Sequence, residues 1–168
     1  MISKKICMLG AFAVGKTSLV QQYVYSIFSD NYLSTVGVKI SKKTVTVNGE
    51  ETVLILWDME GSDAYTDVNV SYLRGAMGFF LVADGTRHYT LDVALQLRAA
   101  ALDVTGPVPH CLLINKADLA PDWQVTRDDV DRMRNDERIV TFATCARTGQ
   151  SVDEAFLTLA GAMQGQSR

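Results

Sequence analysis

The segment from Gly10 to Thr17 constrains the fold of this chain more than any other part of its sequence. It reads GAFAVGKT, which fits the spacing G-x-x-x-x-G-K-[ST], and it lies between an apolar run, residues 6–9, and an amphipathic run, residues 19–25. Two glycines at this spacing let backbone amides curl around a polyphosphate, while a lysine supplies positive charge and a hydroxyl binds Mg²⁺. A helix that begins at Lys16 adds the positive end of its dipole. The segment therefore predicts a strand, a phosphate-binding loop and a helix, in that order.

Length and charge narrow the classes of function. With 168 residues the chain is long enough for one domain, which we expect to extend over residues 1–168, with its core within residues 4–163. The net charge is −3 and no basic run exceeds Lys42-Lys43, which argues against binding to nucleic acid or to a membrane through a basic patch. We therefore expect a monomer that binds no nucleic acid.

The cysteines indicate a reducing compartment. Cys7, Cys111 and Cys145 are odd in number and widely spaced, a pattern that favours neither a disulfide framework nor a metal cluster. No charged and apolar leader precedes Ile2, and no apolar run approaches the 18 residues of a membrane span. We expect a cytoplasmic protein without a membrane segment of its own.

Apolar runs of strand length recur along the chain, and each is too continuously hydrophobic for a sheet with one exposed face. They are residues 6–9, 53–57, 79–83, 111–114 and 139–142. Stretches with helical periodicity lie between them, at residues 17–25, 91–102, 127–133 and 152–163. Thr126 and Ser151 precede acidic first turns and are predicted N-caps. The alternation predicts an α/β fold with a mainly parallel sheet between helices.

One pair of strands is predicted to be antiparallel. Residues 39–47 alternate polar and apolar side chains, and Asn48-Gly49 then leads into residues 53–57. Asn-Gly between two such runs is a strong signal for a hairpin, which we place at the edge of the sheet. Ligands of open parallel sheets bind beyond the carboxyl ends of the strands.

Two polar motifs follow predicted strands. Asp58 to Gly61, DMEG, brings a carboxylate that can hold Mg²⁺ and a glycine whose amide can approach a terminal phosphate. Asn115 to Asp118, NKAD, ends in an acid that can accept two parallel N–H bonds from the edge of a guanine. After the last strand, the amide of Ala146 in Thr144-Cys145-Ala146 could meet the guanine carbonyl oxygen.

Five segments stand in the order and spacing of the guanine-nucleotide motifs of Ras-like small GTPases, which the chain resembles from about residue 4 to residue 163. They are Gly10 to Thr17, Thr35 in STVG, Asp58 to Gly61, Asn115 to Asp118, and Cys145-Ala146-Arg147. Trp57-Asp58, LRGA at residues 73–76 and VDEAF at residues 152–156 are most similar to the Rab branch. The resemblance implies a P-loop G domain of six strands, five of them parallel, flanked by five helices.

The resemblance also implies binding of GTP or GDP with Mg²⁺ and hydrolysis of GTP. Lys16, Thr35 and Gly61 would act in catalysis, and Thr17 and Thr35 would ligate Mg²⁺, with Asp58 behind a metal-bound water. The residues expected to contact the nucleotide are Ala13, Val14, Gly15, Lys16, Thr17, Ser18, Phe28, Thr35, Gly61, Asn115, Lys116, Asp118, Cys145, Ala146 and Arg147.

Partners are expected at two switch regions, Asp30 to Val38 and Met59 to Gly75. Protein effectors and regulators would bind there, because Thr35 and Gly61 would order these loops around the γ-phosphate of GTP. Tyr32, Tyr65 and Tyr72 lie in or near the two regions and could form a patch for a partner, or could simply pack.

Two departures from the family pattern bear on hydrolysis. Ser62 stands where the family has a glutamine that orients the attacking water, and a serine is too short for that role. Phe12 and Ala13 replace smaller residues, and the Phe12 ring would project toward the γ-phosphate and any incoming arginine. Glu60 or Asp63 could hold the water instead, although side chains of this kind commonly face solvent. We expect slow turnover without an activating partner.

These features leave three hypotheses. The first is a GTP-dependent switch with weak intrinsic GTPase activity. The second is a non-hydrolysing scaffold that holds GTP or GDP to fix an interaction surface. The third is a small-molecule kinase with the same phosphate loop, against which NKAD argues, because such kinases usually take ATP and need a lid. Cys145 replaces the usual serine, but the Ala146 amide is retained, so base binding should persist.

Overall fold

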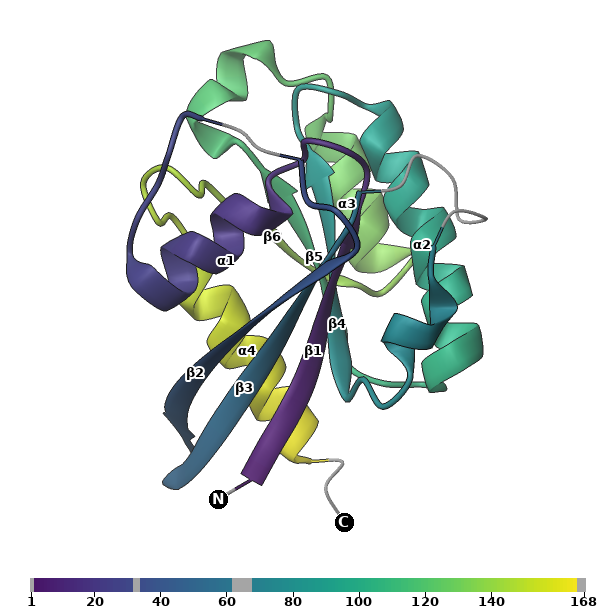
Figure 1. Ribbon diagram of the computed structural model, residues 1–168. Helices are drawn as coiled ribbons and strands as arrows, with labels where there is room; N and C mark the ends of the chain where they lie inside the picture. The colour runs from purple at the N-terminus through teal and green to yellow at the C-terminus, as the bar shows by residue number, and fades with distance from the viewer. Residues whose placement is uncertain (1, 32–33, 62–67, 166–168) are drawn as a thin grey trace.

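The computed structural model describes residues 2–31, 34–61 and 68–165. The described chain forms a six-stranded sheet in the order β2-β3-β1-β4-β5-β6 (Figure 1). Its strands are β1 (Ile2–Gly10), β2 (Val38–Val47), β3 (Glu50–Met59), β4 (Gly78–Asp84), β5 (His110–Asn115) and β6 (Val140–Ala143). All neighbouring strands pair in parallel except β2 and β3. The predicted α/β fold with one antiparallel edge strand is confirmed.

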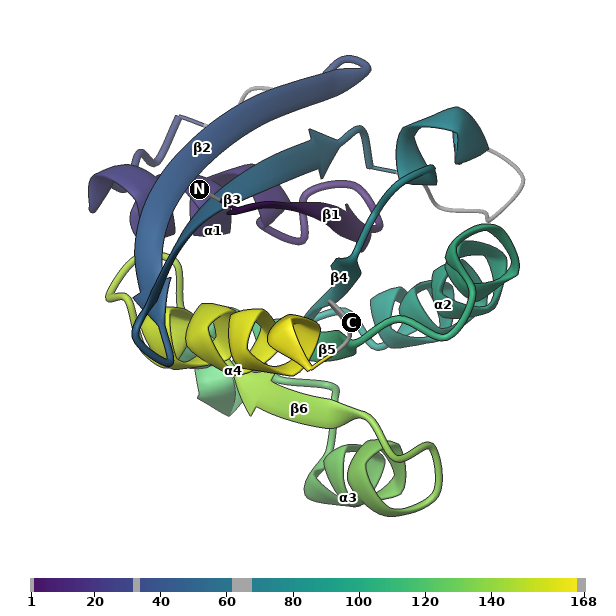
Figure 2. The same ribbon diagram turned by 90° about the horizontal axis from the view of Figure 1, so that it is seen from below.

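Helices cover both faces of the sheet, as the continuously apolar strands require. The helices of the described residues are α1 (Lys16–Tyr25), α2 (Tyr89–Thr105), α3 (Arg127–Asn135) and α4 (Val152–Gln164), with 3₁₀ segments η2 (Val70–Leu73) and η3 (Ala117–Asp122). Viewed along the strands, α1 and α4 lie on one side of the sheet and α2 and α3 on the other (Figure 2).

Aromatic side chains join helices α1 and α4 to the sheet. Phe156 of α4 stacks on Tyr23 of α1 with ring centroids 3.9 Å apart, and it meets Phe80 of β4 at 4.6 Å. Phe80 and Phe156 have no exposed surface. Burial of each such ring contributes roughly 1.5–3 kcal/mol, so this contact fixes both helices against the sheet.

The turn between β2 and β3 follows directly from its sequence. Asn48 and Gly49 both have positive φ, 50° and 80°, as a type I′ turn requires. The strands on either side pair in register from Val47 with Glu50 to Val38 with Met59. The predicted hairpin is confirmed, and β2 is an edge strand of the sheet.

The two predicted N-caps have different outcomes. Thr126 accepts a hydrogen bond from the amide of Asp129, whose carboxylate accepts one from the amide of Thr126, so α3 begins with a capping box. Ser151 precedes α4 as expected, but the prediction that it caps is wrong. Its φ of 58° puts it in the left-handed region, and its side chain accepts no cap hydrogen bond from the described helix.

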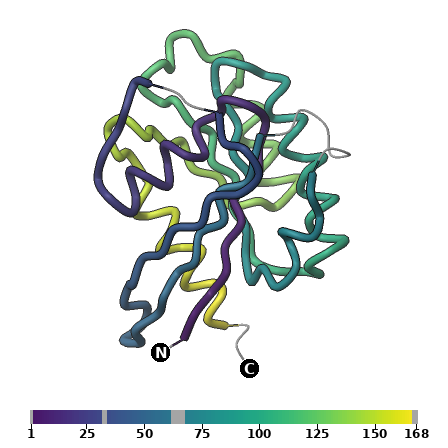
Figure 3. Tube along the Cα trace, viewed as in Figure 1, coloured from purple at the N-terminus to yellow at the C-terminus, as the bar shows by residue number. Residues whose placement is uncertain are grey.

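The carboxyl ends of the parallel strands meet at one end of the sheet, opposite the two chain termini (Figures 1 and 3). The loop from β1 to α1, the end of β3 and the loop after β5 all lie at that end. The fold therefore brings together motifs that lie far apart in the sequence, such as those of Val14 and Asn115, which are 101 positions apart. Ser62, Asp63, Tyr32 and Tyr65, on which some expectations rest, lie outside the described residues.

Candidate functional site

The loop between β1 and α1 is closed around a buried lysine. The ammonium of Lys16 donates hydrogen bonds to the carbonyls of Gly10 and Ala11, each at 2.9 Å. Helix α1 begins at Lys16 as predicted, after Gly15 with φ 107°. A Cβ at Gly15 would lie 2.2 Å from Nδ2 of Asn115, so this position requires glycine for both its φ and its space.

A set of oxygens suited to Mg²⁺ lies beside this loop. The hydroxyls of Thr17 and Thr35 are 2.7 Å apart, and the Thr17 hydroxyl donates to Oδ2 of Asp58 at 2.5 Å. Oδ1 of Asp58 is buried and has no hydrogen-bond partner among the described residues. Hydroxyl and carboxylate oxygens are ligands that Mg²⁺ prefers, and an orphaned carboxylate oxygen leaves a position for it. The residues present therefore fit the ion.

The surroundings of Asp58 raise its pKa above the ordinary value of an aspartate. Burial raises the pKa of Asp58, while the hydrogen bond from Thr17 and the charges of Lys16 and Lys39 oppose the rise. Asp58 lies one residue before the end of β3, so the strand reaches slightly further than predicted. A rigid strand thus carries this carboxylate into the site.

A pocket of about 400 Å³ lies between the phosphate loop and the loops that follow β5 and β6. Its lining includes nine residues of the predicted nucleotide site: Ala13, Gly15, Ser18, Phe28, Asn115, Lys116, Asp118, Ala146 and Arg147. A neighbouring pocket of about 470 Å³ is lined by Thr17 and Thr35 and shares Ser18 and Ser29 with the first. The two pockets therefore adjoin each other at these two serines.

Arg147 lies close to three other residues that line the first pocket. Its guanidinium pairs with Asp30 at 2.8 Å, lies 5.3 Å from the ring centroid of Phe28, and has Nε 3.9 Å from Oδ2 of Asp118. Asp30 and Arg147 are largely exposed, so this pair adds little to stability. It places one cation beside the acid that is expected to bind the base.

Asn115 connects the loops instead of facing the pocket alone. Its Nδ2 donates to the carbonyl of Val14 at 3.0 Å, and its Oδ1 accepts a bond from the hydroxyl of Thr144 at 3.1 Å. Both side chains are buried. Three motifs that are far apart in the sequence are thereby fixed to one another. Cys145, the next residue after Thr144, is buried and its side chain is not among those that line the pocket.

Trp123 supports the loop after β5 from behind. Its indole N–H donates to the carbonyl of Lys116 at 2.8 Å, and Lys116 has the unusual φ of 74°. A Cβ at Gly85 would lie 2.1 Å from the indole ring, so the ring packs flat on a residue without a side chain. This contact holds Lys116 in a conformation that costs of order 1–3 kcal/mol in isolation.

Asp84, at the end of β4, gathers two cations below the phosphate loop. Its carboxylate pairs with Nζ of Lys116 at 2.8 Å and with Nε of Arg87 at 2.9 Å, and accepts two further bonds from Thr86. Burial alone would raise the pKa of Asp84, but the bonds from Lys116, Thr86 and Arg87 together hold it below its ordinary value. Asp84 is therefore a buried, ionised anchor.

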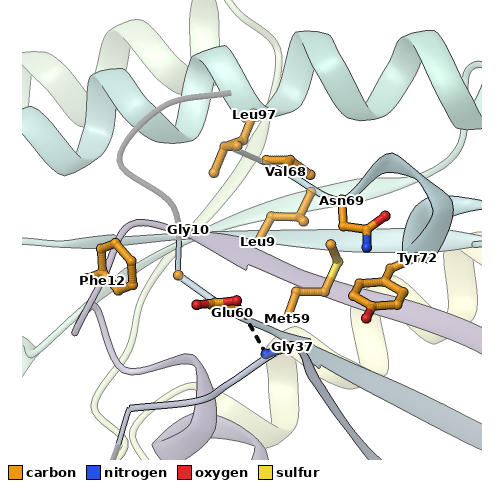
Figure 4. A pocket seen from close by; sticks show the side chains of 11 residues that line it. Leu9, Gly10, Phe12, Gly37, Met59, Glu60, Val68, Asn69, Tyr72 and Leu97 are labelled. Atoms are coloured by element: carbon orange, nitrogen blue, oxygen red, sulfur yellow. Dashed lines mark hydrogen bonds between the residues drawn. The ribbon is translucent and has the colours of Figure 1, made fainter. Parts of the chain in front are cut away.

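The other side of the phosphate loop meets the second switch region. A Cβ at Gly61 would lie 2.8 Å from Cα of Phe12, so the two backbones touch. The amide of Glu60 donates to the carbonyl of Gly37 at 2.8 Å, and its carboxylate accepts from the Gly37 amide at 3.3 Å. These residues line a pocket of about 350 Å³, with Phe12 at one end and Tyr72 at the other (Figure 4).

The sequence motifs did not point to Asp84, Arg87 or Trp123. A signal for Asp84 existed, because it is a charged residue directly after a buried parallel strand, where ligand sites form. Arg87 and Trp123 carried no such signal, since a lone arginine or tryptophan in a loop is ordinary. Their partners become visible only when the loops are brought together.

Comparison with known proteins decides the family. A model of the Ras family matches residues 5–165. The chain belongs to the Ras family. Among its relatives, Ras-related protein Rab-13 of Rattus norvegicus is 32% identical over 157 residues, which are 93% of this chain and 77% of that protein.

Two further Rab proteins show similar levels of identity. Ras-related protein Rab-7L1 of Rattus norvegicus is 34% identical over 171 residues, 98% of this chain and 83% of the relative. Ras-related protein Rab-8B of Homo sapiens is 30% identical over 157 residues, 93% of this chain and 76% of the relative. The protein is thus a GTP-binding, Ras-like small GTPase on the Rab side of the family. Within the part of this small GTPase that the structure describes, no helix combines the length and apolar character needed to cross a membrane.

Proposed function

We propose that this small GTPase is a switch whose own hydrolysis of GTP is slow, so that leaving the GTP-bound state depends on an activating partner. The contact between Phe12 and Gly61 carries the proposal. It puts a bulky side chain of the phosphate loop directly against the glycine that precedes the water-orienting position, where this chain has Ser62. Positioning is nearly all the catalysis that phosphoryl transfer offers, so crowding together with a missing amide should slow it.

The phosphate side of the site would work through a few groups. The ammonium of Lys16 would neutralise charge on the β- and γ-phosphates, and Thr35 and Gly61 would contact the γ-phosphate. Mg²⁺ held by Thr17 and Thr35, with Asp58 behind a bound water, would offset the charge that develops between the phosphates. Loss of the γ-phosphate would release the two loops, which is the switching event.

The base side would select guanine. Asp118 would accept two N–H bonds from the base, and the Ala146 amide would donate to its carbonyl oxygen. Phe28 would pack on the edge of the base and the alkyl stem of Lys116 over its face. Because a bound base would cover Asp118, a base that leaves this acid unpaired, such as adenine, would be rejected by about 10⁴-fold.

Release of phosphate in a single turnover tests the proposal. GTP-loaded protein is mixed with Mg²⁺, and the wild type is compared with Ser62→Gln, with Phe12→Gly and with the double variant. Each single change should raise the rate roughly tenfold or more, because one restores an orienting amide and the other removes the crowding. Leu157→Ala, at an exposed apolar residue of α4, is the control and should leave the rate unchanged. Wild-type release as fast as that of the double variant would contradict slow turnover.

A non-hydrolysing scaffold is the second candidate, and the paired bonds between Glu60 and Gly37 favour it. They join the two switch regions through protein atoms, whereas a switch depends on the γ-phosphate to join them. Hydrogen exchange of the Gly37 and Glu60 amides separates the two functions. Equal protection with GDP and with a non-hydrolysable GTP analogue, together with no phosphate release over days, would support the scaffold.

A further inference from the structure

The phosphate loop of this protein contains a residue in a conformation that its side chain disfavours. Ala13 has φ 59°, in the left-handed region that glycine adopts freely and alanine does not. Such a residue persists only where its surroundings impose the conformation. Ala13 also lines the pocket proposed for the nucleotide, so its geometry bears on binding.

The peptide groups on both sides of Ala13 are held by cations. The carbonyl of Phe12, which precedes it, accepts a hydrogen bond from Nη2 of Arg87 at 2.8 Å. The carbonyl of Ala13 itself accepts one from Nζ of Lys116 at 3.1 Å. Both cations are anchored to the buried carboxylate of Asp84, at 2.9 Å and 2.8 Å. One buried acid therefore fixes two successive peptide groups of the loop.

Arg87 is suited to this task by the shape of its side chain. Its planar guanidinium uses Nε for Asp84, Nη2 for Phe12 and Nη1 for the hydroxyl of Tyr89 at 2.9 Å. Three separate donors of one rigid group are thus in use, and a lysine has no equivalent fork. The side chain is partly exposed, with 30% of its surface accessible; its bond to Asp84 is part-buried, whereas its bonds to Phe12 and Tyr89 lie at the surface.

The direction of one amide follows from this contact. In a trans peptide the N–H points opposite to the C=O, so a bond that directs the Phe12 carbonyl toward Arg87 turns the amide of Ala13 the other way. We propose that Arg87 is a positioning residue that, through Phe12, holds Ala13 in its left-handed conformation and aims the Ala13 amide at the phosphates of the bound nucleotide. The proposal rests on the nucleotide site proposed above.

Dissociation of a fluorescent GDP analogue in the presence of Mg²⁺ tests the role of Arg87. Arg87→Ala should speed dissociation about tenfold, the size expected for loss of a hydrogen bond to a charged donor. Arg87→Lys should have an intermediate effect, because one ammonium replaces the separate Nε and Nη2 donors that reach Asp84 and Phe12, and it tests the proposal if the alanine variant does not fold. Arg98→Ala is the matched control, since Arg98 is partly buried and paired with Glu137 instead; its dissociation rate should stay within about twofold of the wild type.

Repeating the Arg87→Ala substitution in the Ala13→Gly variant separates a positioning role of Arg87 from a general structural role. In Ala13→Gly the left-handed conformation carries no side-chain penalty, so adding Arg87→Ala should change dissociation less than threefold there. The same tenfold change in both backgrounds, or no change in the Ala13 background, would overturn the proposal. A wild-type protein that binds no GDP would instead overturn the nucleotide site itself, and this proposal with it.

Discussion

The two halves of the nucleotide site are built differently. On the base side, Asn115, Lys116 and Trp123 are fixed by hydrogen bonds to the phosphate loop and to one another. On the γ-phosphate side, the second switch region meets the phosphate loop through the approach of Phe12 to Gly61, and it meets the first switch region through the bonds between Glu60 and Gly37.

This difference between the two halves matches where the sequence departs from the family pattern in ways expected to affect hydrolysis. The sequence of the base side retains NKAD, and its loops are tied together through buried side chains. Phe12 and Glu60, two residues expected to affect hydrolysis, belong to the other half, and Ser62 follows Gly61 of that half in the sequence. The residues expected to slow hydrolysis are therefore separate from those expected to bind the base, and variants confined to one half test whether the two functions are separate as well.

The largest effect is expected at Asp118. Asp118→Asn removes the acceptor of two charge-assisted bonds, which should weaken GDP binding by roughly 10²- to 10⁴-fold and shift preference toward xanthine nucleotides. Competition of GDP and of xanthosine diphosphate against a fluorescent nucleotide measures both the affinity and the base preference. Unchanged preference would show that Asp118 does not read the base.

A smaller effect on GDP release is expected when Mg²⁺ is removed from the phosphate half. Chelation with EDTA should speed GDP release from the wild type by roughly tenfold or more, because the ion offsets phosphate charge. Asp58→Ala should release GDP quickly with or without EDTA, while Glu51→Ala, an exposed acid of the same strand, should behave as the wild type. A normal response to EDTA in Asp58→Ala would remove Asp58 from the metal site.

The support behind the base half can be weakened by removing one hydrogen-bond donor, the indole N–H of Trp123. Trp123→Phe keeps a ring on Gly85 but loses the N–H that bonds to the Lys116 carbonyl, and should speed GDP release about fivefold. Phosphate release from bound GTP should not change. Trp57→Phe is the matched control for GDP release. An effect of Trp123→Phe on hydrolysis would show that the halves are coupled.

The smallest effect is expected outside both halves. Burial alone would raise the pKa of Asp129, but bonds from Thr126 and His88 hold it below its ordinary value, so the carboxylate stabilises the fold above its unfolded pKa, near 4. Asp129→Asn should cost about 1 kcal/mol of unfolding free energy at pH 7. As pH falls through 4 toward the lower folded pKa, the wild type should lose this advantage, which urea titrations at several pH values would detect. A difference in unfolding free energy between the wild type and Asp129→Asn that stays constant with pH would contradict a lowered pKa of Asp129.

The fold was predictable because its signals are local and mutually consistent. Continuous apolar runs gave strands such as β4, Asn48-Gly49 gave the hairpin, and Thr126 with Asp129 gave a helix start. Ser151 failed because capping depends on backbone conformation: at φ 58° its hydroxyl is not positioned to cap, although its sequence context is favourable.

The site was predictable only where motifs have fixed spacing. The phosphate loop and NKAD specify which loops meet, but not what holds them. The bonds of Arg87 to Phe12 and of Trp123 to Lys116 join residues through packing between separate loops, and the sequence contains no periodicity or spacing that would reveal them. Whether each predicted residue contacts nucleotide stays a prediction.

The chain has two tryptophans, and the fold places one in each half. Trp57 lies next to Asp58 on β3, and Trp123 lies behind the base loop. With one indole replaced at a time, the intrinsic fluorescence of the protein would report on each half separately. Nucleotide exchange could then be followed without a labelled ligand. Comparing the rates of the two fluorescence changes would show which half of the site loses its contacts with GDP first.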